Sequence, residues 1–453
     1  MGSAGRLAGA TPGARATAMP PPAMRQPLDL GAVQPVTRPP LQHPSGEVDV
    51  AIVGAGAAGI AAARRCLTRG LTVAVLEARD RVGGRAVTVS LKGHAVDLGA
   101  HWLHAGPINP LVRLGYARGE PLRRAPVDGH LVLRGRIASG AERGPLDRAF
   151  GLADRGLTLA ARAPQDHAAA AALPLLGPWR ERIATVHGLV SGRPLGEVSL
   201  HDFPSMEYAD NRFIAGGFGA YVARLAAGLP IALGTAVKGI DWSGPGVRIE
   251  TVTGALRVRA AIVTAPVMVL QAGAIRFEPA LPPETEEAIS AFLSGTYEHV
   301  VLHWPGSPFS GRDRLATILG NRLNPPGLLT RIDGTPFHYL ELDHPTAASV
   351  RPGGPDAARR FARAVLAEHF GGRSLHGLTI PAVTSWKTDP RALGSWAVAP
   401  PGRAPARERL REPVGGRLWF AGEALSRAQW GTVGGAWEEG ERAADAVAEA
   451  LPR

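Results

Sequence analysis

The chain has 453 residues, and its 50 Lys and Arg against 39 Asp and Glu give a net charge of +11. The positive charge is almost wholly arginine and is scattered along the chain, which argues against the clustered basic stripe of a nucleic-acid-binding module. No stretch reaches the roughly 18 to 20 uncharged apolar residues of a membrane helix, so we expect a soluble, two-domain protein with no nucleic-acid partner and no membrane span.

The first 46 residues differ in composition from the rest. Residues 1–46 are rich in proline, contain little periodic apolar content and have no acid before Asp29. Such a segment buries too little apolar surface to fold, so a disordered tail is predicted. It lacks the apolar core of a secretion signal, and a cytoplasmic protein is expected, with a targeting role for the tail left open. Cys66 is the only cysteine, which excludes an internal disulfide and argues against a thiolate metal site.

A βαβ pattern follows the tail. Val48–Val53 is an apolar, β-branched run that predicts a strand, and the turn after it has the spacing G-x-G-x-x-G. An Ala-rich helix then ends at Gly70, and Leu71–Leu76 predicts a second strand. A strand, a glycine turn, a helix and a strand in this order are typical of a dinucleotide-binding unit.

The glycines and the acid of this unit have separate tasks. Gly54 allows the tight turn, Gly56 lets backbone N–H groups approach a pyrophosphate, and Gly59 lets the helix pack closely on the strand. The anion then lies at the positive end of the helix. Glu77, which ends the second strand, offers its carboxylate to a ribose 2′-OH. An ordinary glycine turn without a nucleotide is the alternative, and the flanking strands and the terminal acid disfavour it.

The segment Arg79–Arg85 adds two glycines beside several arginines. Glycine permits close backbone approach, and arginine forms paired hydrogen bonds to phosphate. A hairpin-like alternation, Ala86–Val96, comes next, and then His101, Trp102 and His104 beside a Gly-Ala pair. This last group indicates either backbone passing close to a flat ligand or a packed tryptophan with two surface histidines, and the segment alone does not decide between them.

The middle of the chain is less informative. Leu157–Leu176 is Ala-rich and predicts a helix up to Pro174. Further elements follow from periodicity. The predicted helices are Tyr221–Ala227, Glu284–Phe292, Asp356–Phe370 and a C-terminal helix with apolar positions 436, 440, 443, 444, 447 and 451, and the predicted strands are Ile231–Trp242, Gly246–Val252, Leu256–Val263, Val300–Trp304 and Arg417–Glu423.

The ends of the chain share an architecture that the middle lacks. We therefore predict an α/β protein, with a Rossmann-like nucleotide domain built from residues 47–104, 210–275 and 380–453. An interleaved mixed α+β substrate domain is expected from residues 105–209 and 276–379. No internal repeat is visible.

Taken together, these residues resemble the flavin-dependent amine oxidases, a family that includes monoamine and polyamine oxidases. The resemblance runs from about Val48 to Leu451 and is weak in the middle. Its markers are the Gly54–Gly59 turn with Glu77, Arg79–Arg85, Gly99–His104 with Asn109-Pro110, Ala261–Pro266, Trp386 with Asp389-Pro390 and Gly394-Ser395-Trp396, and Phe420–Glu423 with Gly431–Ala436.

The resemblance implies FAD as cofactor. It implies Glu77 on the adenosine ribose, Arg85 near the pyrophosphate, Val237 pairing the adenine through its backbone and Glu423 on the ribitol. The start of the last helix would face the flavin ring, and its dipole would stabilise the reduced ring by about 0.5–2 kcal/mol. The residues implied around FAD are Gly54, Gly56, Ala58, Gly59, Glu77, Ala78, Arg79, Gly84, Arg85, Gly99, Ala100, His101, Trp102, Val237, Trp386, Gly422, Glu423, Thr432 and Val433.

The implied chemistry is loss of a hydride equivalent from the carbon next to an amine, giving an imine that water hydrolyses, with O2 reduced to hydrogen peroxide. Some members attach flavin to a cysteine where this chain has Ser395, so FAD is expected to bind non-covalently. Trp396 corresponds to an aromatic wall in front of the flavin, where an amine gains about 0.5–2 kcal/mol. The second aromatic wall expected at Thr432 is absent, and Trp430 is a candidate substitute.

Two histidines complete the candidate catalytic residues. His299 stands where the family usually has a lysine that holds a water near the flavin. It is expected either to hold that water or to take a proton near neutral pH, while a polar residue capping a buried strand is the structural alternative. His104 corresponds to a polar position at the substrate entrance of polyamine oxidases, and functional and structural roles are evenly balanced for it.

Three functions stay open at this point. An FAD-dependent amine oxidase leads, a flavin-dependent C–C desaturase is the enzymatic alternative because one fold serves several chemistries, and a low-turnover FAD-binding scaffold is the third. The substrate and the oligomeric state do not follow from the sequence. The acids of the middle segments that it leaves unassigned are Glu207, Asp210, Glu341 and Asp343.

Overall fold

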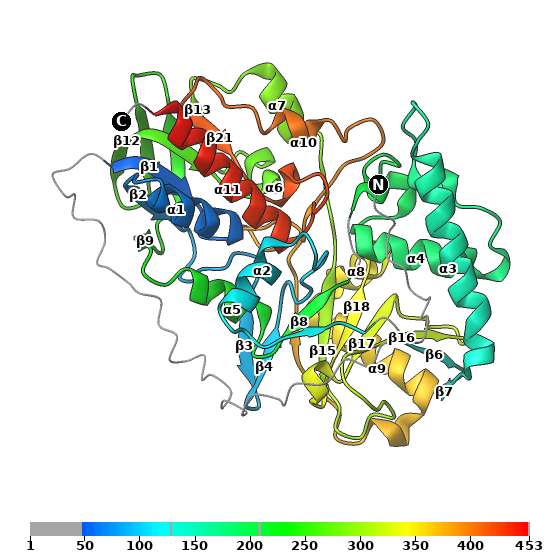
Figure 1. Cartoon of the computed structure of the whole chain (residues 1–453). Coiled ribbons are helices and arrows are strands. Elements are labelled where there is room, and N and C mark those ends of the chain that lie inside the picture. The colour runs from blue at the N-terminus through cyan, green and yellow to red at the C-terminus, as the bar shows by residue number, and fades with distance from the viewer. Residues whose placement is uncertain (1–47, 127–128, 207–209, 452–453) are drawn as a thin grey trace.

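The structure, a computed structural model, describes residues 48–126, 129–206 and 210–451. The predicted disordered tail, residues 1–46, lies outside these described residues. Two large sheets, each covered by helices, form the two halves of the molecule in Figure 1. This is the α/β class expected from the sequence.

The first sheet is built around the predicted βαβ unit. It has eight strands in the order β13-β10-β11-β12-β1-β2-β9, with β21 also paired to β12. Strand β1 is parallel to both β2 and β12, and its residues from Val50 to Val53 are all buried. Continuous apolar runs of this kind are typical of parallel strands covered on both faces. The strands are β1 (Val48–Val53), β2 (Val73–Leu76), β9 (Ile231–Ala232), β10 (Val237–Asp241), β11 (Val247–Thr251), β12 (Ala255–Val263), β13 (Arg276–Glu278) and β21 (Leu418–Phe420).

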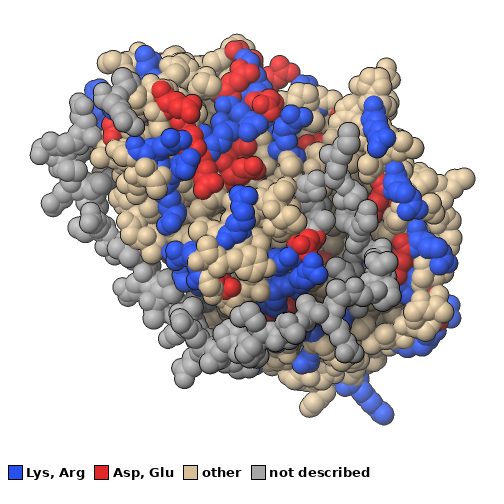
Figure 2. Space-filling view, viewed as in Figure 1, with Lys and Arg blue, Asp and Glu red and all other residues tan. Residues whose placement is uncertain are grey.

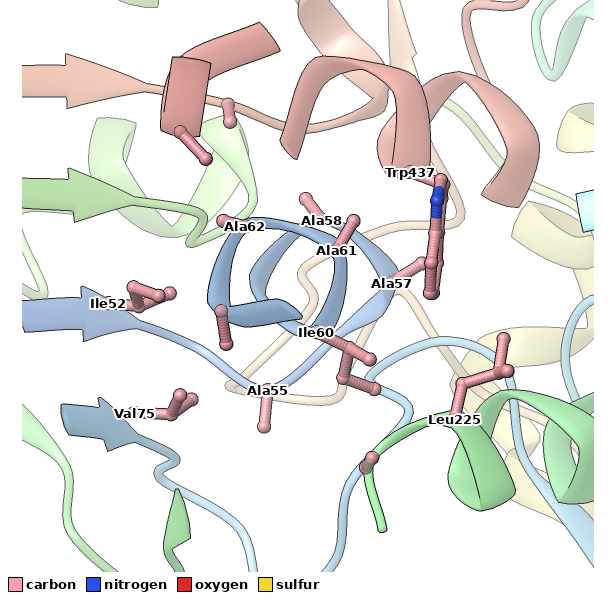
Figure 3. Packing of buried hydrophobic residues seen from close by; sticks show 14 of the residues in the cluster. Ile52, Ala55, Ala57, Ala58, Ile60, Ala61, Ala62, Val75, Leu225 and Trp437 are labelled. Atoms are coloured by element: carbon pink, nitrogen blue, oxygen red, sulfur yellow. The ribbon is translucent and has the colours of Figure 1, made fainter. Parts of the chain in front are cut away.

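Helix α1 (Ala57–Thr68) packs along helix α11 (Val433–Ala450), and both contact this sheet, so segments from near the two ends of the described chain are side by side (Figure 1). Small residues allow this approach, because the distance between packed helices is set by the side chains at their contact. A Cβ at Gly440 would lie 2.1 Å from the carbonyl oxygen of Ala58. Figure 3 shows Ala57 of α1 beside Trp437 of α11, with Ile52 and Val75 of the sheet on another side of the helix.

The second sheet has seven strands in the order β19-β15-β18-β17-β16-β6-β7, antiparallel except where β16 pairs with β6. Alternate residues of β15 face opposite sides. Val300 and Leu302 pack with helix α9 (Gly354–Phe370), whereas His299 and Val301 point away from it. The strands are β6 (Gly129–Leu133), β7 (Arg136–Ile137), β15 (Glu298–His303), β16 (Arg314–Leu319), β17 (Gly327–Thr330), β18 (Phe337–Leu342) and β19 (Thr379–Val383).

Shorter elements join and cover the two sheets. Two helices, α3 (Gly140–Ala160) and α4 (Arg180–Ser191), lie beside the second sheet on the outer side of the molecule (Figure 1). The remaining elements are the hairpin β3 (Thr88–Leu91) and β4 (His94–Asp97), the pair β5 (Leu122–Arg124) and β8 (Arg212–Ile214), the pair β14 (Leu293–Ser294) and β20 (Ala397–Val398), and helices α2 (Pro110–Ala117), α5 (Phe218–Leu225), α6 (Val267–Gln271), α7 (Pro283–Ser290), α8 (His344–Val350) and α10 (Ala406–Arg409).

Two predicted elements are wrong. The helix predicted at Leu157–Leu176 instead starts at Gly140 and ends at Ala160, and only a 3-10 turn forms at Ala169–Ala172. Ser139 and Glu142 form a capping box that starts α3, and Pro164 cannot continue a helix because it lacks an N–H donor. The single strand predicted at Ile231–Trp242 is two strands, β9 and β10, which pair with different neighbours around Gly234, whose φ is +62°.

The limits of the two domains stay a prediction, although two strands extend past them. Strand β13 belongs to the first sheet, although the middle segment of the nucleotide domain was expected to end at residue 275. Strand β19 belongs to the second sheet and continues to Val383, although the substrate domain was expected to end at residue 379. Within the described residues, no helix is long and apolar enough to cross a membrane. On the face shown in Figure 2, basic and acidic side chains lie interspersed. Many of the partly exposed arginines are paired with acids, such as Arg65 with Asp445 and Arg411 with Glu408.

Candidate active site

One cavity of about 510 Å³ connects the glycine turn after β1 with the inner face of the second sheet and with helices α3 and α4. All of the predicted cofactor and catalytic residues line it except Gly59. Gly59 instead packs below the turn, where a Cβ would lie 1.9 Å from the carbonyl oxygen of Gly54. The roles of the individual residues at this site stay predictions, but their convergence on one cavity is a property of the fold.

The end of the cavity at α1 has the form of an anion site. Gly56 is the N-cap of α1, makes no side-chain cap, and no acid lies in the first turn. The unpaired N–H groups and the positive end of the helix dipole are therefore available to a phosphate. A second glycine turn lies on the first, since Gly83 N donates to Ala55 O at 2.8 Å and a Cβ at Gly84 would lie 3.3 Å from Gly56 Cα. A side chain at either turn would narrow the space that a pyrophosphate needs.

Glu77 is buried at the end of β2, where only 6% of the residue is exposed. Its Oε2 accepts a hydrogen bond from Ala55 N at 2.7 Å, and Oε1 accepts one from Arg79 N at 2.8 Å. Each carboxylate oxygen has a further lone pair, so these bonds hold the side chain in place without using its capacity for a ribose hydroxyl. Ala78 lies beside it on the cavity wall, and Val237 lines the same end from the start of β10.

Arg85 and Glu423 connect three distant segments across the cavity. Arg85 Nη1 donates to Ser395 O at 2.8 Å and to Glu423 Oε1 at 3.2 Å. Glu423 also accepts from the backbone N–H groups of Ala397 and Gly431, both at 3.1 Å. The contact of Glu423 with the ribitol stays a prediction, and the observed bonds give it a second task, which is to hold these segments together.

The start of α11 is also directed at the cavity. Thr432 caps the helix, because its Oγ1 accepts from Gly435 N at 2.9 Å, and both Thr432 and Val433 line the wall. The Gly-Ala corner at Gly99 and Ala100 lines the same cavity. A Cβ at Gly99 would lie 1.9 Å from Arg85 O and 3.1 Å from the Trp386 ring, so the backbone at this corner packs closely on both residues. His101 is buried, which argues against the alternative of two surface histidines. Passage of this backbone close to a flat ligand stays a prediction.

Trp396 forms a rigid aromatic wall. Its indole Nε1 donates to Ser191 O at 2.8 Å. Glycines border it on several sides, because a Cβ at Gly192, Gly295 or Gly431 would come within 2.7 to 3.2 Å of its atoms. The proposed substitute for the second wall, Trp430, is wrong. Its ring is fully buried behind the cavity, and its Nε1 donates to Asp202 O.

Tyr297 lies beside Trp396 instead, with ring centroids 5.6 Å apart, and it lines the cavity. Sequence reasoning did not single it out. The available signal was the alternation of β15, which places Tyr297 two residues before His299 and hence on the same side.

His299 is 1% exposed, and neither ring nitrogen has a hydrogen-bond partner among the described residues. Aromatic rings surround it, with centroids of His101, Tyr297 and Tyr339 at 4.9, 5.0 and 4.7 Å. Burial lowers its pKa well below the ordinary value. The expected proton uptake near neutral pH is therefore wrong. Its ring also caps no strand, since the bonds of His299 to Thr384 are made by its backbone N–H and C=O groups. Two free nitrogens in a cavity wall remain consistent with holding a water.

His101 and His104 are neutral as well. Burial lowers the pKa of His101 to about 4 and that of His104 to about 3. His104 Nδ1–H donates to Asn211 Oδ1 at 3.2 Å, and its ring stacks on Trp102 with a centroid separation of 5.9 Å. Both histidines are thus packed in the wall of the cavity, and the entrance role of His104 stays a prediction.

Glu341 is the functional candidate that the sequence left unassigned. In the sheet, Glu341 of β18 stands opposite His299 of β15 on one side and opposite Gly327 of β17 on the other. All three residues line the cavity. A Cβ at Gly327 would lie 2.0 Å from Glu341 Oε2, which shows that this glycine provides the room for the carboxyl group. Tyr297 Oη donates to Glu341 Oε1 at 2.5 Å, and burial raises the pKa of Glu341 to about 7.

The other unassigned acids are not comparable. Asp210 is paired with Arg212, and Asp343 caps α8 through a bond from Thr346 N. Glu207 lies outside the described residues. The described part of the chain contains no cluster of three or more His, Cys, Asp or Glu that would hold a metal ion. A charged residue inside the apolar strand Phe337–Leu342 was the sequence signal that distinguished Glu341.

Comparison with known proteins is consistent with this geometry. Residues 161–448 match the family model of flavin containing amine oxidoreductases, and residues 52–116 match that of an NAD(P)-binding Rossmann-like domain. The chain is 30% identical over 434 residues to polyamine oxidase 3 of Oryza sativa subsp. japonica, covering 87% of this chain and 88% of that one.

Longer proteins and solved structures are also similar. The chain is 28% identical to lysine-specific histone demethylase 1B of Mus musculus, over 88% of this chain but 52% of that one, so it spans about half the length of these relatives. Wild-type putrescine oxidase bound to putrescine superposes with a TM-score of 0.74 at 19% identity, covering 89% of this chain and 99% of that one. The last likeness shows the fold.

Proposed function

Since the chain belongs to the flavin containing amine oxidoreductase family, we propose that it oxidises an amine to an imine with non-covalently bound FAD. Water hydrolyses the imine to an aldehyde or ketone, and O2 is reduced to hydrogen peroxide. The observation that carries this proposal is the single cavity, which joins a dinucleotide cradle at Gly56 to an aromatic chamber at Trp396.

The residues present are compatible with FAD. Uncapped N–H groups at the start of α1 are suited to the pyrophosphate, and Glu77 to the adenosine ribose. The Gly99 corner and the start of α11 both line the cavity with little side-chain bulk at Gly99 and Ala100, which suits the close approach of a flat ring.

The chemistry of Ser395 supports a non-covalent cofactor. Its Oγ accepts a hydrogen bond from Tyr297 N at 2.9 Å and donates to Tyr297 O at 3.0 Å. A serine so engaged is no nucleophile toward the ring. The single cysteine, Cys66, is buried in α1, where burial raises the pKa of its thiol to about 12.

Positioning of the amine is the task of the chamber walls. FAD, when bound, supplies the acceptor of two electrons from the carbon next to nitrogen. Trp396 and Tyr297 restrict the amine to one orientation and exclude water from it. Because Trp396 is held by Ser191 and bordered by three glycines, it presents a fixed face.

Glu341 handles the proton. An alkylamine reaches the protein as an ammonium ion, and C–H cleavage needs the neutral form with its free lone pair. Transfer of one N–H proton to Glu341 Oε2 produces that form and leaves a neutral carboxyl group. A pKa raised to about 7 makes this carboxylate basic enough to take the proton while it is still ionised in neutral solution. Tyr297 holds Oε1 and so leaves Oε2 toward the cavity.

The neutral ring of His299 completes the chamber. With no proton to gain near neutral pH, it acts as a hydrogen-bonding group, and we assign to it the water that the family places next to the reacting centre. Such a water is suitably placed to attack the imine.

The test is anaerobic mixing of the FAD-loaded protein with a panel of primary and secondary amines. We expect bleaching of the flavin absorbance by at least one of them, and peroxide when air is readmitted. Bleaching only by a substrate with an unsaturable C–C bond would contradict amine oxidation and indicate a desaturase. No bleaching by any compound, with FAD retained, would indicate a binding scaffold.

A further inference from the structure

Helices α3 and α4 carry an acid and a histidine that the mechanism does not use. Asp154 of α3 and His187 of α4 both line the cavity, and Asp154 Oδ1 lies 3.5 Å from His187 Nε2. Neither of these atoms has a hydrogen-bond partner in the part of the chain that the structure describes. The His187 side chain is 9% exposed and that of Asp154 14%.

Asp154 differs in this respect from other aspartates of the cavity wall. Asp147, two turns earlier on the same helix, is paired with Arg143 at 3.1 Å, and Asp210 is paired with Arg212. A buried carboxylate without a cation is costly, by several kcal/mol after relaxation. The charge of Asp154 is therefore left for a cation that enters through the cavity.

The surroundings of the pair suit an alkylammonium group. The rings of Phe150 and Phe203 meet His187 edge to face, with centroids at 5.9 and 5.4 Å, and both also line the cavity. Burial lowers the pKa of His187 to about 4 and raises that of Asp154 to about 7. The histidine thus stays neutral and accepts a hydrogen bond through Nε2, while aromatic faces and a carboxylate attract a cation.

The pair is also separate from the reacting end. Helix α4 touches Trp396 at Ser191. His187 lies one turn earlier, about 6 Å along the helix axis at 1.5 Å per residue. Leu189 and Val190 line the wall in between. A ligand that reaches both ends therefore needs an apolar stem between two nitrogen atoms.

We propose that Asp154 and His187 form a second amine subsite, which holds the distal ammonium group of a diamine or longer polyamine while its other amine lies at Trp396. This inference rests on the proposed function, because it assigns the substrate class of the same cavity. Asp154 accepts an N–H of the distal group, His187 Nε2 accepts another, and Phe150 and Phe203 exclude water from it.

The test compares 1,4-diaminobutane with 1-aminobutane, which has the same stem and lacks the second nitrogen. Anaerobic flavin reduction gives the apparent dissociation constant of each. We expect the wild type to prefer the diamine by about 10- to 100-fold, as a charge-assisted hydrogen bond implies. Asp154→Asn is expected to abolish that preference and to leave 1-aminobutane unchanged. Asp147→Asn, on the same helix and wall, is the control and is expected to keep the preference.

Several outcomes would overturn the subsite. They are a wild type without a diamine preference, an equal loss for both amines in Asp154→Asn, or a loss of preference in Asp147→Asn. His187→Gln is a second variant, expected to weaken the diamine alone, in case Asp154→Asn does not fold. Calorimetric binding of 1,4-diaminobutane needs no turnover. If no amine reduces the flavin, the proposed function fails, and binding that depends on Asp154 still supports the subsite, whereas binding independent of Asp154 contradicts it.

Discussion

The two ends of the cavity are built in different ways. The cradle at α1 depends on backbone, because Gly54, Gly56 and Gly59 stand within one turn and Glu77 follows after a single helix and strand. The chamber depends on side chains from five distant segments, which carry Asp154, His187, His299, Glu341 and Trp396. A turn built from neighbouring residues is recognisable as a sequence motif. The chamber, in contrast, forms only when the sheets and helices have assembled.

The largest expected effect comes from a buried arginine behind the segments that carry Trp396 and Glu423. Arg407 is 1% exposed and donates to both carboxylate oxygens of Asp202, at 2.9 and 2.7 Å, and to the carbonyl oxygens of Ala397 and Ala424. These carbonyls adjoin Trp396 and Glu423 in sequence. Arg407→Met leaves Asp202 buried without its cation, so we expect the free energy of unfolding to fall by about 3–5 kcal/mol.

Urea unfolding measures this change, and Arg409→Met on the same helix is its control. Arg409 is partly exposed and pairs with two exposed acids, Glu412 and Glu284, so its loss should cost about 0–1 kcal/mol. Equal effects of the two variants would contradict a stabilising role of the buried ion pair between Arg407 and Asp202.

The second prediction separates the cradle from the chamber. A Cβ at Gly59 would lie 1.9 Å from the carbonyl oxygen of Gly54, so Gly59→Ala must push α1 away from the turn. We expect a loss of about 1–3 kcal/mol in unfolding free energy and a protein purified with little FAD. Flavin absorbance per chain is the measurement. Gly140→Ala, at an open helix position with nothing within 4 Å, should keep its flavin. Full flavin content in Gly59→Ala would contradict the role of this glycine.

The same contrast explains what the sequence could predict. The glycine turn, its strands and Glu77 were readable because each residue acts on its immediate neighbours. Trp396 and His299 were found through the family resemblance, but the neutral state of His299 depends on three rings that other segments contribute.

Glu341 and Asp154 could not be assigned from the sequence, for two different reasons. Glu341 faces the cavity because of the register of β18 against β15 and β17. Asp154 meets His187 only where α3 packs on α4. That packing was not foreseeable, because the sequence had placed the helix at Leu157–Leu176, beyond Asp154.

The third prediction concerns the chamber alone. His299→Ala removes two free ring nitrogens from the wall without touching the cradle. We expect flavin reduction or reoxidation to slow about fivefold, the value of one hydrogen bond of ~1 kcal/mol, with bound FAD unchanged. Stopped-flow absorbance measures both half-reactions. His303→Ala, four residues later on the same strand, is the control. Unaltered rates for both half-reactions would leave His299 with a packing role.

The smallest expected effect is a pH dependence of the rate of flavin reduction that the wild type shows and Glu341→Gln lacks. Its pKa is raised from 4.5 to about 7 by burial, so about half of the carboxyl groups are ionised at pH 7 and nearly all at pH 9. We expect the rate of flavin reduction at saturating amine to rise about twofold across this interval, as the ionised fraction doubles. Glu341→Gln cannot ionise, and its rate should be lower and free of this step. The ratio of the two proteins cancels the titration of the amine itself.

Stability should change in the opposite direction over a lower pH range. A carboxyl group whose folded pKa is raised binds its proton more tightly in the folded state, so its contribution is fully present below pH 4.5 and is lost as pH rises through about 7. The wild type should therefore lose stability relative to Glu341→Gln between these values, while its activity depends on the form that appears. If the ratio of the two rates does not change from pH 7 to 9, Glu341 is not the group that accepts the proton of the amine. If the difference in stability between the two proteins does not change with pH, the carboxyl group is not buried as the cavity geometry requires.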